Sequence, residues 1–165
     1  MADIIDYSVK VKKREIQHEI FSQVKSKKIV TLGGPSIDNY VPLLRSYGFE
    51  EIISFETNIE VFLRQCSLAS KFDNVTIKYG SILDNLDKYP GYFFDLDFCA
   101  TIKPVERYLQ DIAKLEEYCL TFALRPIGEE LTKKIFYSYV PNFKIELRWY
   151  KDKGHQKMFN IIKRK

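Results

Sequence analysis

The sequence is poor in the residues that build disulfide frameworks and metal sites. Its 165 residues include three widely spaced cysteines, Cys66, Cys99 and Cys119, and two histidines, His18 and His155. An odd number of distant cysteines indicates neither a disulfide framework nor a zinc-type ligand set. The two histidines stand too far apart in the chain to form a recognisable ligand pair. We therefore expect no metal site and an intracellular, cytoplasmic location.

Long apolar runs are also missing. No stretch approaches the roughly 20 consecutive apolar residues that span a bilayer. The first six residues include two acids and lack the basic and apolar regions of a secretion signal. Hydrophobic residues make up 45% of the chain and charged residues 29%, which is ordinary for a globular protein. The length predicts one domain, residues 1–165, with one core and no membrane contact.

Charge is distributed unevenly along the chain. Residues 1–28 carry a net charge of +3, residues 29–130 a net charge of −7, and residues 131–165 a net charge of +8. Basic ends on an acidic body indicate an anionic partner, RNA or DNA, that docks near the termini. The alternative interpretation is that these lysines only keep exposed strands soluble and prevent them from pairing with other chains.

Short apolar runs alternate with helical patterns over most of the sequence. The patterns predict strands at 29–32, 52–55, 75–79, 92–95 and 120–124, and helices at 14–24, 37–47, 58–69, 104–115 and 128–139. Five strands that alternate with helices imply a parallel sheet covered on both faces.

The end of the chain departs from this alternation. Residues 143–150 and 157–162 alternate apolar and polar side chains around Asp152-Lys153-Gly154, a pattern typical of a hairpin. No crossover helix fits between them. The predicted fold is an α/β, Rossmann-like three-layer sandwich. Its mostly parallel seven-stranded sheet has an antiparallel C-terminal hairpin, with the final strand inserted antiparallel.

The first strand runs directly into two glycines, Gly33 and Gly34. Glycine lets the backbone approach a ligand closely because no Cβ stands in the way. The second strand ends at Glu56, 23 residues after Gly33. A ribose-binding acid follows such a turn after roughly 20 residues. This spacing predicts a nucleotide-binding unit in which Glu56 accepts hydrogen bonds from ribose hydroxyls.

A leading helix, five strand–helix units and a closing hairpin resemble the class I S-adenosylmethionine-dependent methyltransferases. The resemblance covers nearly the whole chain in element order. It implies that the protein binds S-adenosylmethionine and transfers its methyl group. An NAD-dependent reductase is disfavoured by the hairpin and by the absence of Gly-x-Gly-x-x-Gly.

The first motif of that family is an acid, an apolar residue and then Gly-x-Gly-x-Gly. Here Thr31 takes the place of the acid, Gly33 matches, and Pro35 takes the place of the second glycine. The resemblance implies that Gly33 and Gly34 line the methionine side of the cofactor. Asp38 is a candidate replacement for the missing acid.

After the third strand, Gly80-Ser81-Ile82 stands where many family members have a glycine–acid pair that touches adenine. The resemblance implies that the Ser81 hydroxyl accepts the adenine amino group and that Ile82 packs on the ring. Asp84 is an alternative to Ser81.

The fourth strand leads into Asp95-Leu96-Asp97-Phe98. This segment loosely resembles the Asp-Pro-Pro-Tyr/Phe loop of methyltransferases that act on base amino groups, with Asp95 and Phe98 at its first and last positions. The resemblance implies that Asp95 lies at the cofactor and binds or deprotonates the acceptor, and that Phe98 stacks on it. Asp97 is the next catalytic candidate. Strand alternation places both carboxylates on one side, with at most one desolvated. Two solvated turn acids are the alternative.

The leading functional hypothesis is S-adenosylmethionine-dependent methyl transfer, with nucleic acid as the acceptor. A small-molecule or protein acceptor stays open, as does the oligomeric state. The departures in the first and fourth motifs favour an alternative of another class. It is a non-catalytic Rossmann-like module that binds nucleic acid or a partner protein.

Overall fold

A computed structural model describes residues 7–98, 100–124, 127–140, 146–151 and 157–164. Seven strands form one sheet in the order β3-β2-β1-β4-β5-β7-β6. The strands are β1 (Lys28–Thr31), β2 (Glu51–Glu56), β3 (Val75–Tyr79), β4 (Phe93–Asp97), β5 (Glu117–Ala123), β6 (Glu146–Lys151) and β7 (Lys157–Lys163). The first five are parallel, and β7 is antiparallel to both β5 and β6. The predicted Rossmann-like sheet and its inserted last strand are confirmed.

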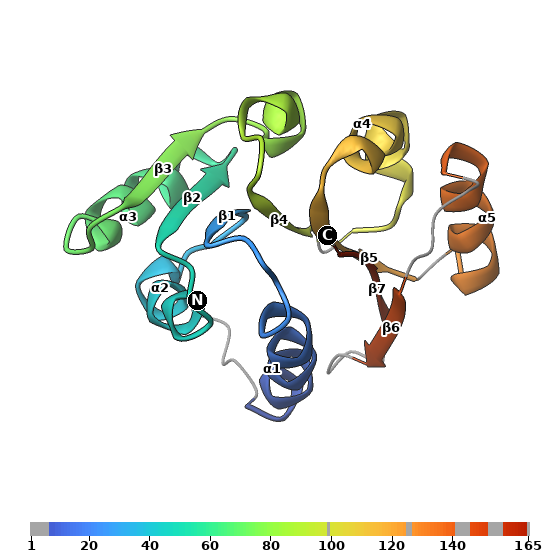
Figure 1. Ribbon diagram of the computed structural model, residues 1–165, viewed down its shortest axis with the longest axis horizontal. Helices are drawn as coiled ribbons and strands as arrows, with labels where there is room; N and C mark the ends of the chain where they lie inside the picture. The colour runs from blue at the N-terminus through green and yellow to red at the C-terminus, as the bar shows by residue number, and fades with distance from the viewer. Residues whose placement is uncertain (1–6, 99, 125–126, 141–145, 152–156, 165) are drawn as a thin grey trace.

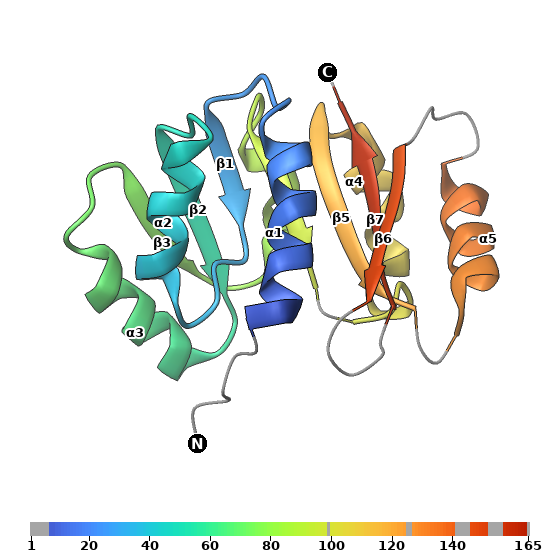
Figure 2. The ribbon, with the colours of Figure 1, turned by 90° about the horizontal axis from the view of Figure 1, so that it is seen from below.

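Helices cover both faces of the sheet, which makes three layers (Figure 1). One face carries α1 (Tyr7–Phe21), α2 (Ile37–Ser46) and α3 (Ile59–Ala69). The other carries the 3-10 helices η1 (Ile82–Lys88) and η2 (Lys103–Tyr108) together with α4 (Leu109–Lys114) and α5 (Glu129–Tyr139). Figure 2 shows α1 in front of the sheet between β1 and β5, running roughly along the strands. No helix in the described ranges is long and apolar enough to cross a membrane.

Local sequence explains where several helices begin and end. The Asn58 side chain accepts hydrogen bonds from the backbone of Glu60 (3.0 Å) and Val61 (3.1 Å) and so caps the start of α3. Gly48, with φ of +89°, follows α2, in the left-handed conformation that glycine adopts without strain. Pro104 stands in the first turn of η2, where its missing N–H has no partner to lose.

Strand β4 sends alternate side chains to opposite faces of the sheet. Phe93 packs in the core beneath α1 and α2, whereas Phe94 and Leu96 pack in the core on the α4 side. Asp95 and Asp97 therefore face α1, as their contacts with Thr31 and Lys13 show. This alternation places two carboxylates side by side between the sheet and α1.

Where the predicted range is fully described, three elements have bounds that differ by more than one residue, and the predicted helix at 104–115 divides into η2 and α4. The helix α1 begins and ends earlier than 14–24, β5 begins at Glu117 rather than Leu120, and β4 continues to Asp97 rather than ending at Asp95. The acids of β4 look like turn residues in sequence, but Asp95 pairs with Thr31 and Cys119 in the sheet. The predicted turn at 152–154 and Cys99 lie outside the described residues.

Candidate active site at the carboxyl ends of β1 and β4

The turn after β1 is held by side chains from β2 and α3. Gly33 N donates to Ser54 Oγ at 3.0 Å, and Gln65 Nε2 donates to the Gly34 carbonyl at 2.7 Å. A Cβ at Gly33 would overlap with Ile37 Cδ1 and lie 2.8 Å from Ser54 Oγ. Gly34 has φ of +64°, and a Cβ there would meet nothing within 4 Å. Packing thus requires glycine at Gly33, and the backbone favours it at Gly34, beside open space.

Asp95 is a buried carboxylate with two hydroxyl partners. Asp95 is only 6% exposed. Asp95 Oδ2 accepts hydrogen bonds from the Tyr40 hydroxyl at 2.7 Å and from Thr31 Oγ1 at 3.0 Å. Thr31 occupies the position of the acid in the first motif, and Asp95 lies beside it on the neighbouring strand. A carboxylate is therefore present at this point of the site, supplied by β4 instead of β1.

The surroundings of Asp95 disfavour its charged form. Burial raises the pKa of Asp95, as does the charge of Asp97, while the Tyr40 hydrogen bond, the Lys13 charge and the Thr31 hydrogen bond lower it. The pKa of Tyr40 is raised well above its ordinary value, first by burial and then by the Asp95 charge. Asp95 is therefore a better proton acceptor than an exposed aspartate.

Asp97 ends β4 and lies nearer to solvent. Its side chain is 13% exposed and forms an ion pair with Lys13 of α1. Asp95 is the more buried of the two acids, and Asp97 has intermediate exposure. Gly33, Asp95 and Asp97 line one pocket of about 210 Å³, which Lys13 of α1 and Tyr40 of α2 also line.

The other predicted site residues do not line this pocket. Glu56 stands half-buried at the end of β2, where its Oε1 accepts from the backbone of Asn58 at 2.7 Å. The Ser81 hydroxyl accepts from Leu83 N at 3.2 Å and caps η1. Gly34 adjoins the pocket through the β1 turn.

Two placements differ from the expected ones. Ile82 is 2% exposed and packs in the core on the α4 side, so its side chain offers no free surface to a ligand ring. The Phe98 ring stacks on Phe122, with centroids 6.5 Å apart, in that same core. Asp95 faces α1 instead. Because β4 continues to Asp97, Asp95 and Phe98 do not share one loop, and strand alternation sends them to opposite faces.

Sequence reasoning missed Tyr40 and Lys13. Tyr40 belongs to the apolar stripe of α2. A core-facing tyrosine hydroxyl needs a hydrogen-bond partner, so this hydroxyl could have indicated a buried polar partner such as Asp95. Lys13 gives no such signal, since its partner Asp97 is 84 residues away in the chain.

Comparison with solved structures identifies the fold. The methyltransferase domain of METTL16 matches with a TM-score of 0.72 and 12% identity, over 97% of this chain and 69% of that one. A candidate rRNA methylase from Clostridium thermocellum matches with a TM-score of 0.62 and 14% identity, over 92% and 96% of the two chains. Methanococcus jannaschii fibrillarin, a pre-rRNA processing protein, matches with a TM-score of 0.60 and 14% identity, over 87% and 70%.

The chain has the fold of the class I S-adenosylmethionine-dependent methyltransferases. No protein-family model and no curated protein matches its sequence.

The residues present suit the cofactor of this methyltransferase fold. Asn58 occupies only one oxygen of the Glu56 carboxylate, so Oε2 can accept from a ribose diol. The turn at Gly34 leaves space where a side chain would stand. The Asp95 carboxylate, beside Gly33 in the pocket, suits a ligand ammonium group.

Proposed function

We propose that the protein transfers a methyl group from S-adenosylmethionine to a nucleic-acid acceptor. The observation that carries this proposal is the convergence of Gly33, Asp95 and Asp97 on one pocket, with Glu56 at the end of the next strand. This pocket lies where the strand order reverses, between β1 and β4. Open α/β sheets bind their ligands at that point, outside the carboxyl ends of the strands.

Bound S-adenosylmethionine would supply an electrophilic methyl group on a sulfonium. The chain then has to hold the cofactor, orient the acceptor and receive its proton. Glu56 holds the ribose, and Gly33 and Asp95 hold the methionine end. Asp97, at the strand end and less buried than Asp95, accepts a hydrogen bond from the acceptor group. The hydrogen bond from the Tyr40 hydroxyl holds the Asp95 carboxylate in position.

Charge and the structural neighbours support a nucleic-acid acceptor. Residues 131–165 carry a net charge of +8, which suits binding to phosphates. Two of the fold matches are named for rRNA methylation and pre-rRNA processing. A protein that binds RNA through this charge should lose affinity steeply as the salt concentration rises.

One observation favours the non-catalytic alternative. The ammonium group of Lys13 already lies on the Asp97 carboxylate and so occupies the position where an acceptor would bind. A module that had lost methyl transfer could keep this ion pair as a structural contact. The two candidates make different predictions for turnover, and only the methyltransferase requires cofactor binding.

The test is calorimetry with S-adenosylmethionine, followed by transfer of a labelled methyl group to RNA. Glu56→Ala removes two charge-assisted hydrogen bonds to ribose, worth about 1.5–3 kcal/mol each, so affinity should fall more than about a hundredfold. Glu60→Ala is the matched control, an exposed acid in the first turn of α3, and should bind normally. Asp97→Asn should lower turnover at unchanged cofactor affinity.

The outcomes separate the candidates. Cofactor binding without transfer to RNA, DNA, protein or small-molecule acceptors would support the non-catalytic module. Transfer to an acceptor other than nucleic acid would overturn the acceptor assignment alone. Wild-type protein that does not bind S-adenosylmethionine at millimolar concentration would refute the proposal.

A further inference from the structure

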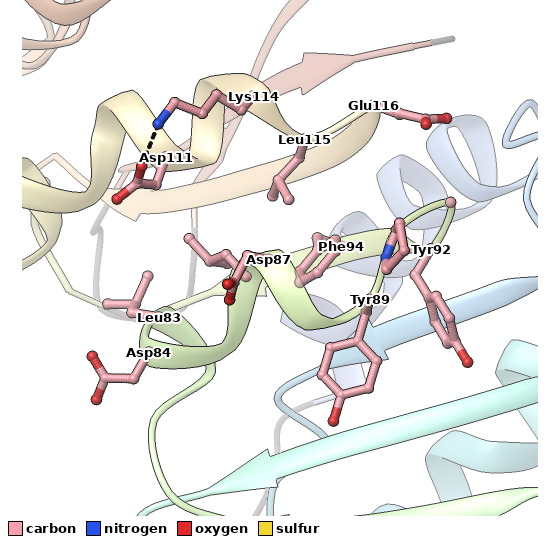
Figure 3. A pocket seen from close by; sticks show the side chains of 13 residues that line it. Leu83, Asp84, Asp87, Tyr89, Tyr92, Phe94, Asp111, Lys114, Leu115 and Glu116 are labelled. Atoms are coloured by element: carbon pink, nitrogen blue, oxygen red, sulfur yellow. Dashed lines mark hydrogen bonds and ion pairs between the residues drawn. The ribbon is translucent and has the colours of Figure 1, made fainter.

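A second pocket lies on the opposite face of the sheet from the methyltransferase site. It has a volume of about 490 Å³ and lies between η1 with the segment before β4 on one side and α4 on the other (Figure 3). Its lining shares no residue with the pocket of Gly33 and Asp97. The volume is in the range of binding sites, which is roughly 300–1,000 Å³.

The rim of this groove is acidic. Four exposed carboxylates come from both walls, and the single lining lysine, Lys114, forms an ion pair with one of them at 2.8 Å. The four rim residues are Asp84, Asp87, Asp111 and Glu116. A rim of this sign repels the phosphates of a nucleic acid, so the groove is not an extension of the proposed acceptor site.

The floor of the groove is apolar and aromatic. Tyr89 and Tyr92 form an edge-to-face pair with ring centroids 5.4 Å apart, next to Phe94 and Leu115. The chain already places one of its own cations on the Tyr92 ring. Lys28 Nζ lies 5.4 Å from the centre of the Tyr92 ring. Aromatic faces attract cations in this way, and the stems of lysine and arginine pack well on apolar floors.

We propose that this groove docks a lysine- and arginine-rich segment of a partner protein. Carboxylates on both walls match the sign of such a segment, and tyrosine faces and leucines match its alkyl stems and cationic groups. The carboxylates are distributed over η1, α4 and the connection before β5 instead of converging on one point. This spacing suits several cationic side chains of an extended segment better than one compact cation. The acidic segment 29–130, with a net charge of −7, supplies the whole lining.

The test uses a fluorescently labelled Arg/Lys hexapeptide and measures anisotropy at low and at physiological salt. The wild-type protein should bind it, and a hexaglutamate peptide should not bind. Asp87→Lys reverses an exposed rim charge and should weaken binding at least fivefold. Asp73→Lys makes the same charge change at an exposed position outside the groove and should change binding less than twofold. Tyr89→Leu keeps an apolar side chain and removes the aromatic face, which should weaken binding about two- to fivefold.

Each outcome decides for or against the groove. Equal weakening by Asp87→Lys and Asp73→Lys would show that the peptide senses only overall charge, which overturns the proposal. No binding even at low salt does the same. Spermine that binds as tightly as the peptide, with the same dependence on Asp87 and Tyr89, would assign the groove to a small polycation instead. Thermal melts of each variant verify that it is folded, and S-adenosylmethionine binding should be unchanged in all three.

Discussion

The hydrogen bond from Tyr40 to Asp95 should contribute measurably to stability, and Tyr40→Phe tests this. The bond joins a hydroxyl to a carboxylate at 2.7 Å, in a residue only 6% exposed. Hydrogen bonds to charged groups contribute about 1.5–3 kcal/mol, and neutral ones about 0.5–1.5 kcal/mol. Thr31 stays as the second hydroxyl partner in the variant. We therefore expect Tyr40→Phe to lower the free energy of unfolding by about 1.5–3 kcal/mol when Asp95 is ionised.

The loss should depend on pH in a defined direction. Burial raises the folded-state pKa of Asp95 above its ordinary value of 3.8, so the folded state holds this proton more tightly than the unfolded state. The resulting stabilisation is complete below the unfolded pKa and is lost as pH rises through the folded-state pKa. The hydrogen bond from Tyr40 opposes the shift, so the pKa of Asp95 should rise further in Tyr40→Phe. The destabilisation by Tyr40→Phe should therefore be larger at pH 8 than at pH 4.

Urea unfolding at the two pH values measures the effect. For a protein of this size, each kcal/mol should also shift the melting temperature by roughly 2–4 °C. Tyr137→Phe is the control, because Tyr137 is 39% exposed on α5 and its change should stay within about 0.5 kcal/mol. If Tyr40→Phe also changed the free energy of unfolding by less than about 0.5 kcal/mol at pH 8, or by the same amount at both pH values, the charge-assisted bond would be refuted.

Three further substitutions test the turn after β1 and a buried carboxylate at the amino end of β5. Gly33→Ala places a Cβ against Ile37 and 2.8 Å from Ser54 Oγ, and should cost about 1–3 kcal/mol in urea unfolding. Gly34→Ala meets no atom within 4 Å but must adopt φ of +64°, so its cost should be smaller, about 1–2 kcal/mol. A cost below about 0.5 kcal/mol would contradict the packing conflict at Gly33 or the backbone strain at Gly34, respectively. Glu117→Ala removes a carboxylate, 3% exposed, that accepts from the backbone of Lys25 (3.3 Å) and Ser26 (3.2 Å), so it should cost about 1.5–3 kcal/mol, whereas exposed Glu116→Ala should change unfolding little.

Periodicity predicted most of the fold because most elements obey it. Burial follows the sequence closely in β2, where Ile52, Ile53 and Phe55 are buried and only Ser54 interrupts the apolar run. The prediction from periodicity was wrong at β4, because Asp95 and Asp97 are acids and indicated the end of the strand. Their place in the sheet depends on Tyr40, Thr31 and Lys13, which local sequence does not connect to them. A buried polar group is stable only with partners, and those partners are distant in the chain.

In the candidate site, too, local sequence order predicted some residues, whereas the roles of others depended on the three-dimensional structure. Gly33 and Glu56 follow from the local order of strand, turn and strand, and Asp95 and Asp97 from the end of an apolar run. The roles assigned to Ile82 and Phe98 depended on side-chain direction, which a resemblance in element order does not determine. In the structure both side chains pack in the core on the α4 side.

The inserted last strand has a consequence for the order of folding. Residues 157–163 pair with β5 on one side and β6 on the other, so the strand that leaves the ribosome after the other six described strands lies inside the sheet. Until it arrives, β5 presents an open edge of apolar residues, and such edges pair with other chains. Assembly of this half of the sheet must therefore wait for residues 157–163. Nascent or truncated chains that lack β7 should depend on chaperones, whereas β1 to β4 can pair earlier.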